Sequence, residues 1–197
     1  MRTYQDFNIA TTLALLMQLG CSGSSSNTDL SSSKTVTPAL NSASNSMELN
    51  ACTLLQSIGL EQIIGEATGD ITPIMHMENE GRVVSQCDVG TSSPERSVGL
   101  FIKYSPGESV PKTKAAVISS ESNADMLGLG EETSAAIRNG KDITALGDLA
   151  FTYDLIGFNL MVYWNEHYQM IVMPRGLGDK EEDIAREVAK RVIEAVK

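Results

Sequence analysis

Residues 149–173 place three strand-like runs in close succession, which leaves few ways to arrange them. The runs are rich in apolar, aromatic and β-branched side chains and cover Leu149–Leu155, Phe158–Trp164 and Tyr168–Met173. Gly157 and Asn165–Glu166 supply turn residues between them. Connections this short cannot carry a crossover, so neighbouring runs must pair in the antiparallel sense. The sequence therefore predicts an antiparallel sheet in this part of the chain.

Two earlier segments, residues 82–90 and 97–104, repeat apolar side chains with a period of two. A period of two is typical of a strand with one buried face. The polar stretch "TSSPER" between the segments favours a hairpin. The side chains expected on the buried face are Val83, Cys87 and Val89 in the first segment and Val98, Leu100, Ile102 and Tyr104 in the second.

Helical signals lie on both sides of these strands. In "CTLLQSIGLEQIIG", Asn50 can cap the start, Gly59 divides the segment into two short helices, and Gly65 ends the second. At the other end, "DKEEDIAREVAKRVIEAVK" predicts an amphipathic helix with Asp179 as its N-cap and acidic residues near the positive end of its dipole. The expected buried stripe of this helix is Ile184, Ala185, Val188, Val192, Ile193 and Val196.

The middle of the chain is less regular. Pro111 can open a helix that continues through Ala115, Ala116 and Ile118. Residues 119–142 are polar and rich in glycine, which is typical of helix fragments and loops. Together the segments predict an α+β domain, in which an antiparallel sheet is covered by N-terminal short helices and a C-terminal amphipathic helix.

The N-terminus carries an apolar run, Ile9–Leu19, that ends beside Gly20 and Cys21. The run is too short to span a bilayer, which takes about 20 apolar residues. Its length suits the apolar region of a secretory signal. Cleavage before the cysteine would leave Cys21 as the first residue, with lipid on its thiol, although Gln18 and the residue after it depart from the usual lipoprotein pattern. The alternative is an ordinary N-terminal helix with an incidental cysteine.

These features divide the chain into three parts. Residues 1–20 are the predicted lipoprotein signal peptide, residues 21–46 are the lipidated cysteine and a serine-rich flexible tether, and residues 47–197 are a single globular domain. The tether is predicted because its polar side chains cannot bury enough surface to offset the entropy of ordering. The formal net charge of −10 disfavours nucleic acid as a partner, since phosphates would be repelled.

Three cysteines occur in the sequence. With Cys21 assigned to lipid, Cys52 and Cys87 remain as an even pair in an exported chain, as expected for an oxidising compartment. A bridge between them would close a loop of about 35 residues, worth about 3–4 kcal/mol in the chain-entropy model. The alternative is two free thiols in a cytosolic protein.

Three sequence motifs, taken in their order along the chain, resemble those of a known family. They are "CTLLQSIGLEQIIG", "SQCDVG" and "ALGDLAF", followed by two strands and a last amphipathic helix. The chain resembles small bacterial lipoproteins of the domain-of-unknown-function 3558 type over most of residues 50–197. The resemblance implies that Cys52 pairs with Cys87, that Gly147 and Asp148 form the central motif, and that the protein lies in a bacterial envelope. It implies no defined biochemical role.

Methionine and histidine occur together in two places. Met75, His76 and Met77 form one motif, and His167 with Met170 belongs to the other, "HYQMIVM". Thioether and imidazole groups suit copper(I), and an exported copper carrier would fit the compartment. However, Met170 and the methionine three residues later have opposite strand parity and cannot face one site. The alternative is that these methionines fill gaps in the core, so we expect no metal and no cofactor.

Signals for hydrolysis are weak. No Gly-x-Ser-x-Gly sequence occurs, and only His76 and His167 could act as an imidazole base. We therefore expect a non-enzymatic, lipid-anchored envelope protein that serves as a binding or accessory module for another protein or a small molecule. A metal carrier and an envelope hydrolase are the alternatives. Ser22 after the cysteine is compatible with outer-membrane sorting, facing the periplasm, in a Gram-negative cell.

Overall fold

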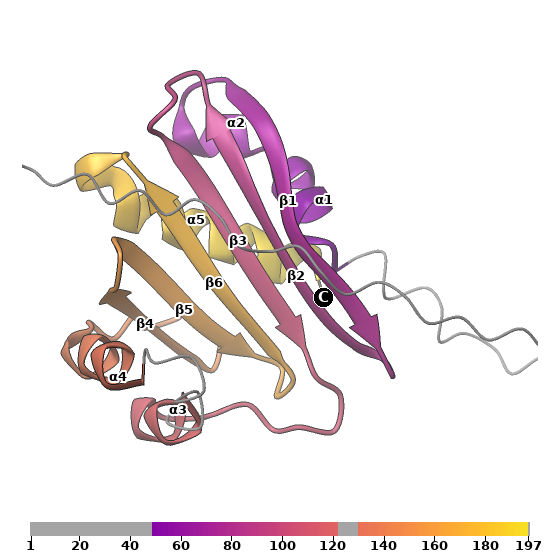
Figure 1. The fold of residues 1–197 in the computed structure, drawn as a ribbon, viewed down its shortest axis with the longest axis vertical. Coiled ribbons are helices and arrows are strands. Elements are labelled where there is room, and N and C mark those ends of the chain that lie inside the picture. The colour runs from indigo at the N-terminus through magenta and orange to yellow at the C-terminus, as the bar shows by residue number, and fades with distance from the viewer. Residues whose placement is uncertain (1–48, 122–129, 197) are drawn as a thin grey trace, which may run out of the picture. The chain divides into compact units, whose positions relative to one another are not determined.

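The computed structural model describes residues 49–121 and 130–196, and these residues contain one antiparallel sheet of six strands (Figure 1). The spatial order is β1-β2-β3-β6-β5-β4, so two meanders of consecutive strands meet where β3 pairs with β6. The strands are β1 Thr68–Asn79, β2 Arg82–Thr91, β3 Ser97–Tyr104, β4 Leu149–Asp154, β5 Phe158–Trp164 and β6 Tyr168–Arg175. The antiparallel pairing predicted for β2 with β3, and for β4 through β6, is confirmed.

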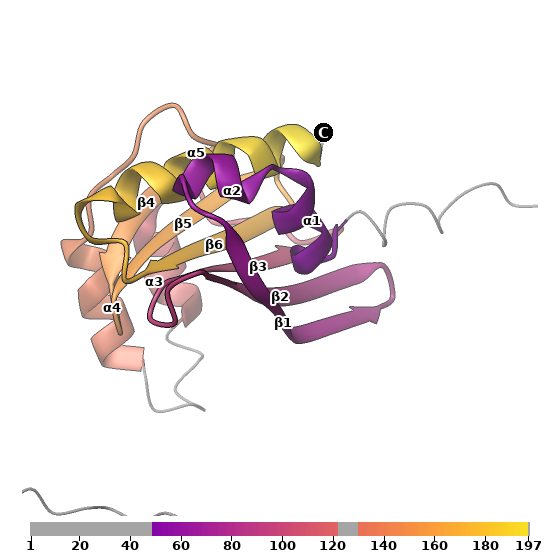
Figure 2. The same ribbon diagram turned by 90° about the horizontal axis from the view of Figure 1, so that it is seen from above.

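Helices lie on both faces of this sheet. The helices α1 Ala51–Ser57, α2 Leu60–Ile64 and α5 Glu181–Ala195 cover one face (Figure 2). On the opposite face, α3 Lys114–Glu121 and α4 Gly130–Asn139 lie beside β4 (Figure 2). The α+β fold class predicted from the sequence is confirmed, including the cover by the N-terminal short helices and the C-terminal helix.

Two apolar clusters follow from this arrangement. The larger one lies between the sheet and α1, α2 and α5, and includes the fully buried Leu100, Ile102, Leu160 and Val172. The smaller one lies under α3 and α4 and comprises Val117, Ile137, Phe151, Tyr153, Met161 and Tyr163. Successive residues of β5 alternate between the two clusters because side chains along a strand point to opposite faces.

The N-terminal helix α1 is attached to β2 by covalent and polar contacts. The Asn50 side chain accepts hydrogen bonds from the backbone N–H groups of Cys52 and Thr53, so it is the N-cap expected from the sequence. Cys52 forms a disulfide with Cys87 of β2, with a Cα–Cα distance of 5.1 Å. The predicted pairing is confirmed, and the alternative of two free thiols is wrong.

Strand β1 was not among the elements predicted from the sequence. It is an edge strand with almost every side chain exposed, so no apolar alternation marks it. It also contains Pro73, and the register with β2 shifts between Pro73 and Met75. A proline and a bulge are both features of edge strands, and they conceal the period of two.

Several helix boundaries differ from the expectation. Helix α3 begins at Lys114 rather than at Pro111, because the Thr113 hydroxyl accepts from the backbone N–H of Ala116 and caps the helix there. Asp179 does not cap α5: it lies in a short 3-10 helix, Gly178–Lys180, that precedes α5. The buried stripe of α5 also includes Ala189, whereas Ile193 and Val196 at its end are only partly buried. Ile193 lines an open hollow beside residues 145–147, and Val196 follows the last residue of α5, so both side chains remain partly exposed.

Candidate functional site

A pocket of about 300 Å³ lies near α3, at the strand ends where β3 leads into the following loop and β5 turns into β6. Three side chains from neighbouring strands lie in one row across the sheet, because Lys103 of β3 pairs with Gln169 of β6 and Gln169 pairs with Tyr163 of β5. The remaining lining residues come from the β3–α3 loop, from α3 and from the β5–β6 turn: Ser105, Glu108, Ser109, Val110, Pro111, Ser120 and His167.

The loop that forms the pocket's rim is fixed to the β5–β6 turn by backbone hydrogen bonds. The Ser105 N–H donates to the His167 carbonyl at 3.0 Å, and the Val110 N–H donates to the Glu166 carbonyl at 2.9 Å. Asn165 and Glu166 both have positive φ, 48° and 61°, which is the backbone of a tight hairpin turn. The turn predicted at these two residues is confirmed, and it positions His167 at the pocket.

His167 is held in one tautomer by its surroundings. Its Nδ1 lies 3.0 Å from the Glu108 carbonyl oxygen. A carbonyl oxygen can only accept a hydrogen bond, so Nδ1 carries the proton and Nε2 is the basic nitrogen of the neutral ring. The Tyr104 ring meets the imidazole edge-on, with centroids 6.4 Å apart. His167 therefore has a fixed orientation and one nitrogen left for a further partner.

The charges at the pocket are positive on balance, although the chain as a whole is acidic. Glu108 is the one carboxylate among the lining residues, and Arg82 neutralises it through an ion pair at 2.7 Å. Lys103 has no ion pair within the described part of the chain. One ammonium charge is thus left uncompensated beside a hydroxyl-rich wall.

Ser105 is the least satisfied polar residue of the pocket. It is only 4 % exposed, and its hydroxyl has no hydrogen-bond partner among the described residues. Leaving a buried hydroxyl unpaired costs about 1–3 kcal/mol. Buried polar groups are paired in most native structures, so an orphan group at a pocket wall indicates a place where a bound molecule can supply the partner.

The methionine and histidine residues considered as copper ligands are not brought together. Met75 and Met77 lie on the α3 face of the sheet, in register with Gln86 and Val84, and His76 lies on the opposite face. Met170 is fully buried in the larger core cluster, and His167 is at the β5–β6 turn. β2 and β3 separate β1 from β6, a distance of about 14 Å. Met170 is therefore a core residue, as the alternative interpretation expected, whereas Met77 is 56 % exposed and fills no gap in the core.

Within residues 49–121 and 130–196, no group of three or more His, Cys, Asp or Glu side chains has the geometry to hold a metal ion. The lipidation site predicted at Cys21, the signal peptide and the tether all lie outside the described residues. No described helix is long and apolar enough to cross a membrane.

The "ALGDLAF" motif forms a tight corner rather than part of the pocket. Gly147 has a positive φ of 65°, and a Cβ at this position would lie 2.5 Å from the Tyr163 carbonyl oxygen. The next residue, Asp148, donates its backbone N–H to the same carbonyl at 2.8 Å. Glycine is therefore required because the corner packs directly against the backbone of β5. Two larger and more open hollows, of about 430 and 590 Å³, flank this corner, and the first of them lies against α5.

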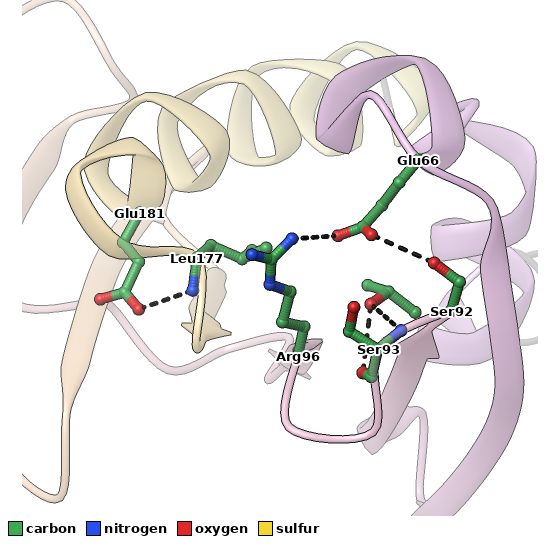
Figure 3. Close-up of polar contacts among 7 residues, drawn as sticks. Glu66, Ser92, Ser93, Arg96, Leu177 and Glu181 are labelled. Atoms are coloured by element: carbon green, nitrogen blue, oxygen red, sulfur yellow. Dashed lines mark hydrogen bonds and ion pairs between the residues drawn. The ribbon is translucent and has the colours of Figure 1, made fainter.

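A second polar cluster lies at the other end of the sheet (Figure 3). Arg96 of the β2–β3 loop pairs with Glu66 at 3.3 Å, and Glu66 also accepts from the Ser92 hydroxyl. Nearby, Glu181 at the start of α5 accepts from the Leu177 backbone N–H. The contacts of Glu66 join the segment before β1 to the β2–β3 loop, and the contact between Glu181 and Leu177 lies within the segment that leads into α5.

Sequence reasoning did not identify the pocket. Lys103 and Tyr163 occupy alternate strand positions whose side chains point away from the larger core cluster. This alternation was the sequence signal that could have indicated a site on that face. The contributions of the β3–α3 loop could not be read from spacing, because they depend on how that loop returns to the β5–β6 turn.

No family model, curated protein or solved structure matches this chain. The assignment of a function therefore depends on the chain's own residues and on the geometry described above.

Proposed function

We propose that this chain is a lipid-anchored protein of the bacterial cell envelope, and that its domain is a non-enzymatic binding module. The observation that carries the proposal is the Cys52–Cys87 disulfide. Disulfides form and persist in exported proteins and are rare in a reducing cytosol. The bridge supports an extracytoplasmic location, which is where a lipoprotein signal ending at Cys21 would deliver the domain.

The N-terminal sequence supplies the rest of the anchoring argument. A signal, a cysteine and a serine-rich segment precede the domain in the order that an anchored protein needs. Several acyl chains at one cysteine hold a protein on a membrane stably, whereas one chain gives reversible binding. The resemblance to the bacterial lipoproteins named above supports the same location, and Ser22 is compatible with the outer membrane of a Gram-negative cell.

The pocket supports a binding role for the domain. Its rim is fixed by the hydrogen bonds of Ser105, Val110 and His167, so binding would not have to order it. A preformed cavity lined by hydroxyl, amide, ammonium and imidazole groups is the kind of surface that recognises a polar small molecule.

Replacing Cys21 tests the anchoring directly. The full chain is produced in a bacterial host with labelled palmitate, and label and membrane association are compared for the wild type, Cys21→Ala and the control Ser24→Ala. We expect label and salt-resistant membrane association in the wild type and the control, and loss of label in Cys21→Ala. Equal labelling of Cys21→Ala, or no label in the wild type, would contradict the proposal.

A further inference from the structure

The pocket between the β3–α3 loop and the β5–β6 turn has the chemistry of an anion site. We propose that it binds a small organic monocarboxylate, with the carboxylate held by Lys103 and Ser105 and a ligand hydroxyl donating to Nε2 of His167. This inference rests on the proposed binding role and names its ligand class. It is drawn from the charges, the orphan hydroxyl and the size of the cavity.

Charge selects an anion with a single negative charge. Lys103 lies between Val84 and Gln169 in the sheet register, and neither neighbour carries a charge. The one lining carboxylate, Glu108, already has Arg82 as its partner at 2.7 Å. A ligand with one negative charge balances the Lys103 ammonium, whereas a dianion would leave a charge in excess.

Hydrogen-bonding capacity points to the same group. The Ser105 hydroxyl lacks a partner among the described residues, and a carboxylate oxygen is an acceptor that could satisfy it. His167 uses Nδ1 for the Glu108 carbonyl, so Nε2 is its remaining contact. In the neutral ring Nε2 accepts, so it can take a hydrogen bond from a hydroxyl group of the ligand.

The remaining lining residues define the body of the ligand. Val110 and Pro111 offer an apolar edge, while Ser109 and the Gln169 amide offer polar contacts. A volume of about 300 Å³ is at the lower end of the range for small-molecule sites. A short hydroxylated acid of sugar-acid size fits this description better than a lipid or a peptide.

Matched probes separate the charge from the body of the ligand. The full chain, purified in detergent, is titrated calorimetrically with gluconate and with sorbitol, and with glycerate and with glycerol. Each pair shares a polyol body and differs in the carboxylate. We expect at least one acid to bind with a Kd of about 1 mM or tighter, and its neutral partner to bind at least tenfold more weakly.

Variants place the binding in this pocket. Lys103→Gln should weaken the acid at least tenfold and remove its advantage over the polyol, while Lys180→Gln, an exposed lysine outside the pocket, should leave the Kd unchanged. Ser105→Ala has a signature that a merely structural residue lacks. It should weaken the acid and yet raise the Tm of the unliganded protein, because it removes an unpaired buried hydroxyl.

Three results would overturn the proposal: no binding of either acid at 20 mM, equal binding of acid and polyol, or an unchanged Kd in a folded Lys103→Gln. None of them bears on the palmitate label at Cys21, which tests the anchor separately. Equal binding of acid and polyol would still leave a binding module, with a neutral ligand.

Discussion

The two edges of the sheet are built differently. At the β4–β5 edge, which we term the closed half, helices cover both faces, with α5 on one side and α3 and α4 on the other (Figure 2). In the meander of β1, β2 and β3, which we term the open half, α1 covers one face, and β1 is exposed along most of its length. Phe151 and Phe101 show the contrast: both point to the α3 side of the sheet, yet Phe151 is fully buried and Phe101 is half-buried.

The difference shows two ways of holding a strand in place. The closed half relies on apolar packing on both faces. The open half has specific links in place of a second helical layer. The disulfide joins α1 to β2. The Ser85 hydroxyl accepts a hydrogen bond from the Ala51 N–H and lies 3.4 Å from the Met75 carbonyl oxygen. A two-stranded hairpin alone is only marginally stable in water, so these links add to the packing that its one covered face provides.

The largest effect should come from truncating an aromatic ring in the closed half. Phe151→Ala should cost about 3–5 kcal/mol, since it leaves a cavity between β4 and the α3–α4 layer. Phe101→Ala, the matched change in the open half, should cost about 1–2 kcal/mol, because part of that ring is already hydrated. Urea unfolding of both variants measures the two losses. Equal losses would show that the two halves are equally covered on the α3 face, which would contradict the comparison.

Removing the disulfide should be nearly as costly. The Cys52→Ala/Cys87→Ala double variant frees a loop with a sequence separation of 35 residues. We expect a loss of about 3–4 kcal/mol in the free energy of unfolding. The free energy of unfolding is measured for the wild type and the double variant, each with and without a reducing agent. Only the wild type should lose stability on reduction, so the double variant serves as the control. A wild type insensitive to reduction would mean that the bridge does not stabilise the open half.

Several elements could be predicted from the sequence because each has one buried face. One apolar cluster buries the alternate residues of β2 and β3 and the stripe of α5 from Ile184 to Val192. Packing against a single core therefore produces the periodic patterns seen in the sequence. β1 gives no such signal, since exposure on both sides removes the alternation. The disulfide was predicted from compartment chemistry and resemblance. The pocket was not predicted, since its walls meet only through the return of the Ser105–Val110 loop to the β5–β6 turn.

The Ser105→Ala variant gives a smaller effect of opposite sign. The hydroxyl is buried without a partner among the described residues, so its removal should stabilise the unliganded protein by up to about 1 kcal/mol. Differential scanning calorimetry measures the shift, with Ser119→Ala on the exposed side of α3 as the comparison. A clear decrease in Tm would show that the Ser105 hydroxyl has a partner after all.

An ion pair of the closed half should contribute a pH-dependent term. The hydrogen bond from Lys141 lowers the pKa of Glu182, against a smaller opposing effect of burial, and the charges of Lys141 and Arg186 add to the lowering. Because the folded pKa is the lower one, the contribution is complete above the ordinary glutamate value of 4.5 and is lost as the pH falls through the lowered value.

Comparing Glu182→Gln with wild type measures this term. We expect a loss of about 0.2–1 kcal/mol at pH 7, since the pair is partly exposed and screened. The difference from wild type should shrink as the pH falls below 4.5, because the wild-type carboxylate becomes protonated. Glu194→Gln, an exposed position on the same helix, should show no such pH-dependent difference. A Glu182→Gln deficit that stays constant as the pH falls would assign the effect to packing and not to charge.

The smallest effect should come from the exposed edge of the open half. Ile74 is 54 % exposed at the irregularity in β1, so Ile74→Thr should change the free energy of unfolding by no more than about 0.5 kcal/mol. Ile137→Thr, at a fully buried position on α4, should be far more damaging. A large loss at Ile74 would mean that another surface covers β1 in solution.

The most direct test of the account is the intact mass of the protein extracted from its own membranes. We expect a chain that starts at Cys21, heavier by its acyl groups and lighter by two hydrogens for the Cys52–Cys87 bridge. A mass equal to that of the complete, unprocessed chain with three free thiols would contradict both the anchor and the bridge.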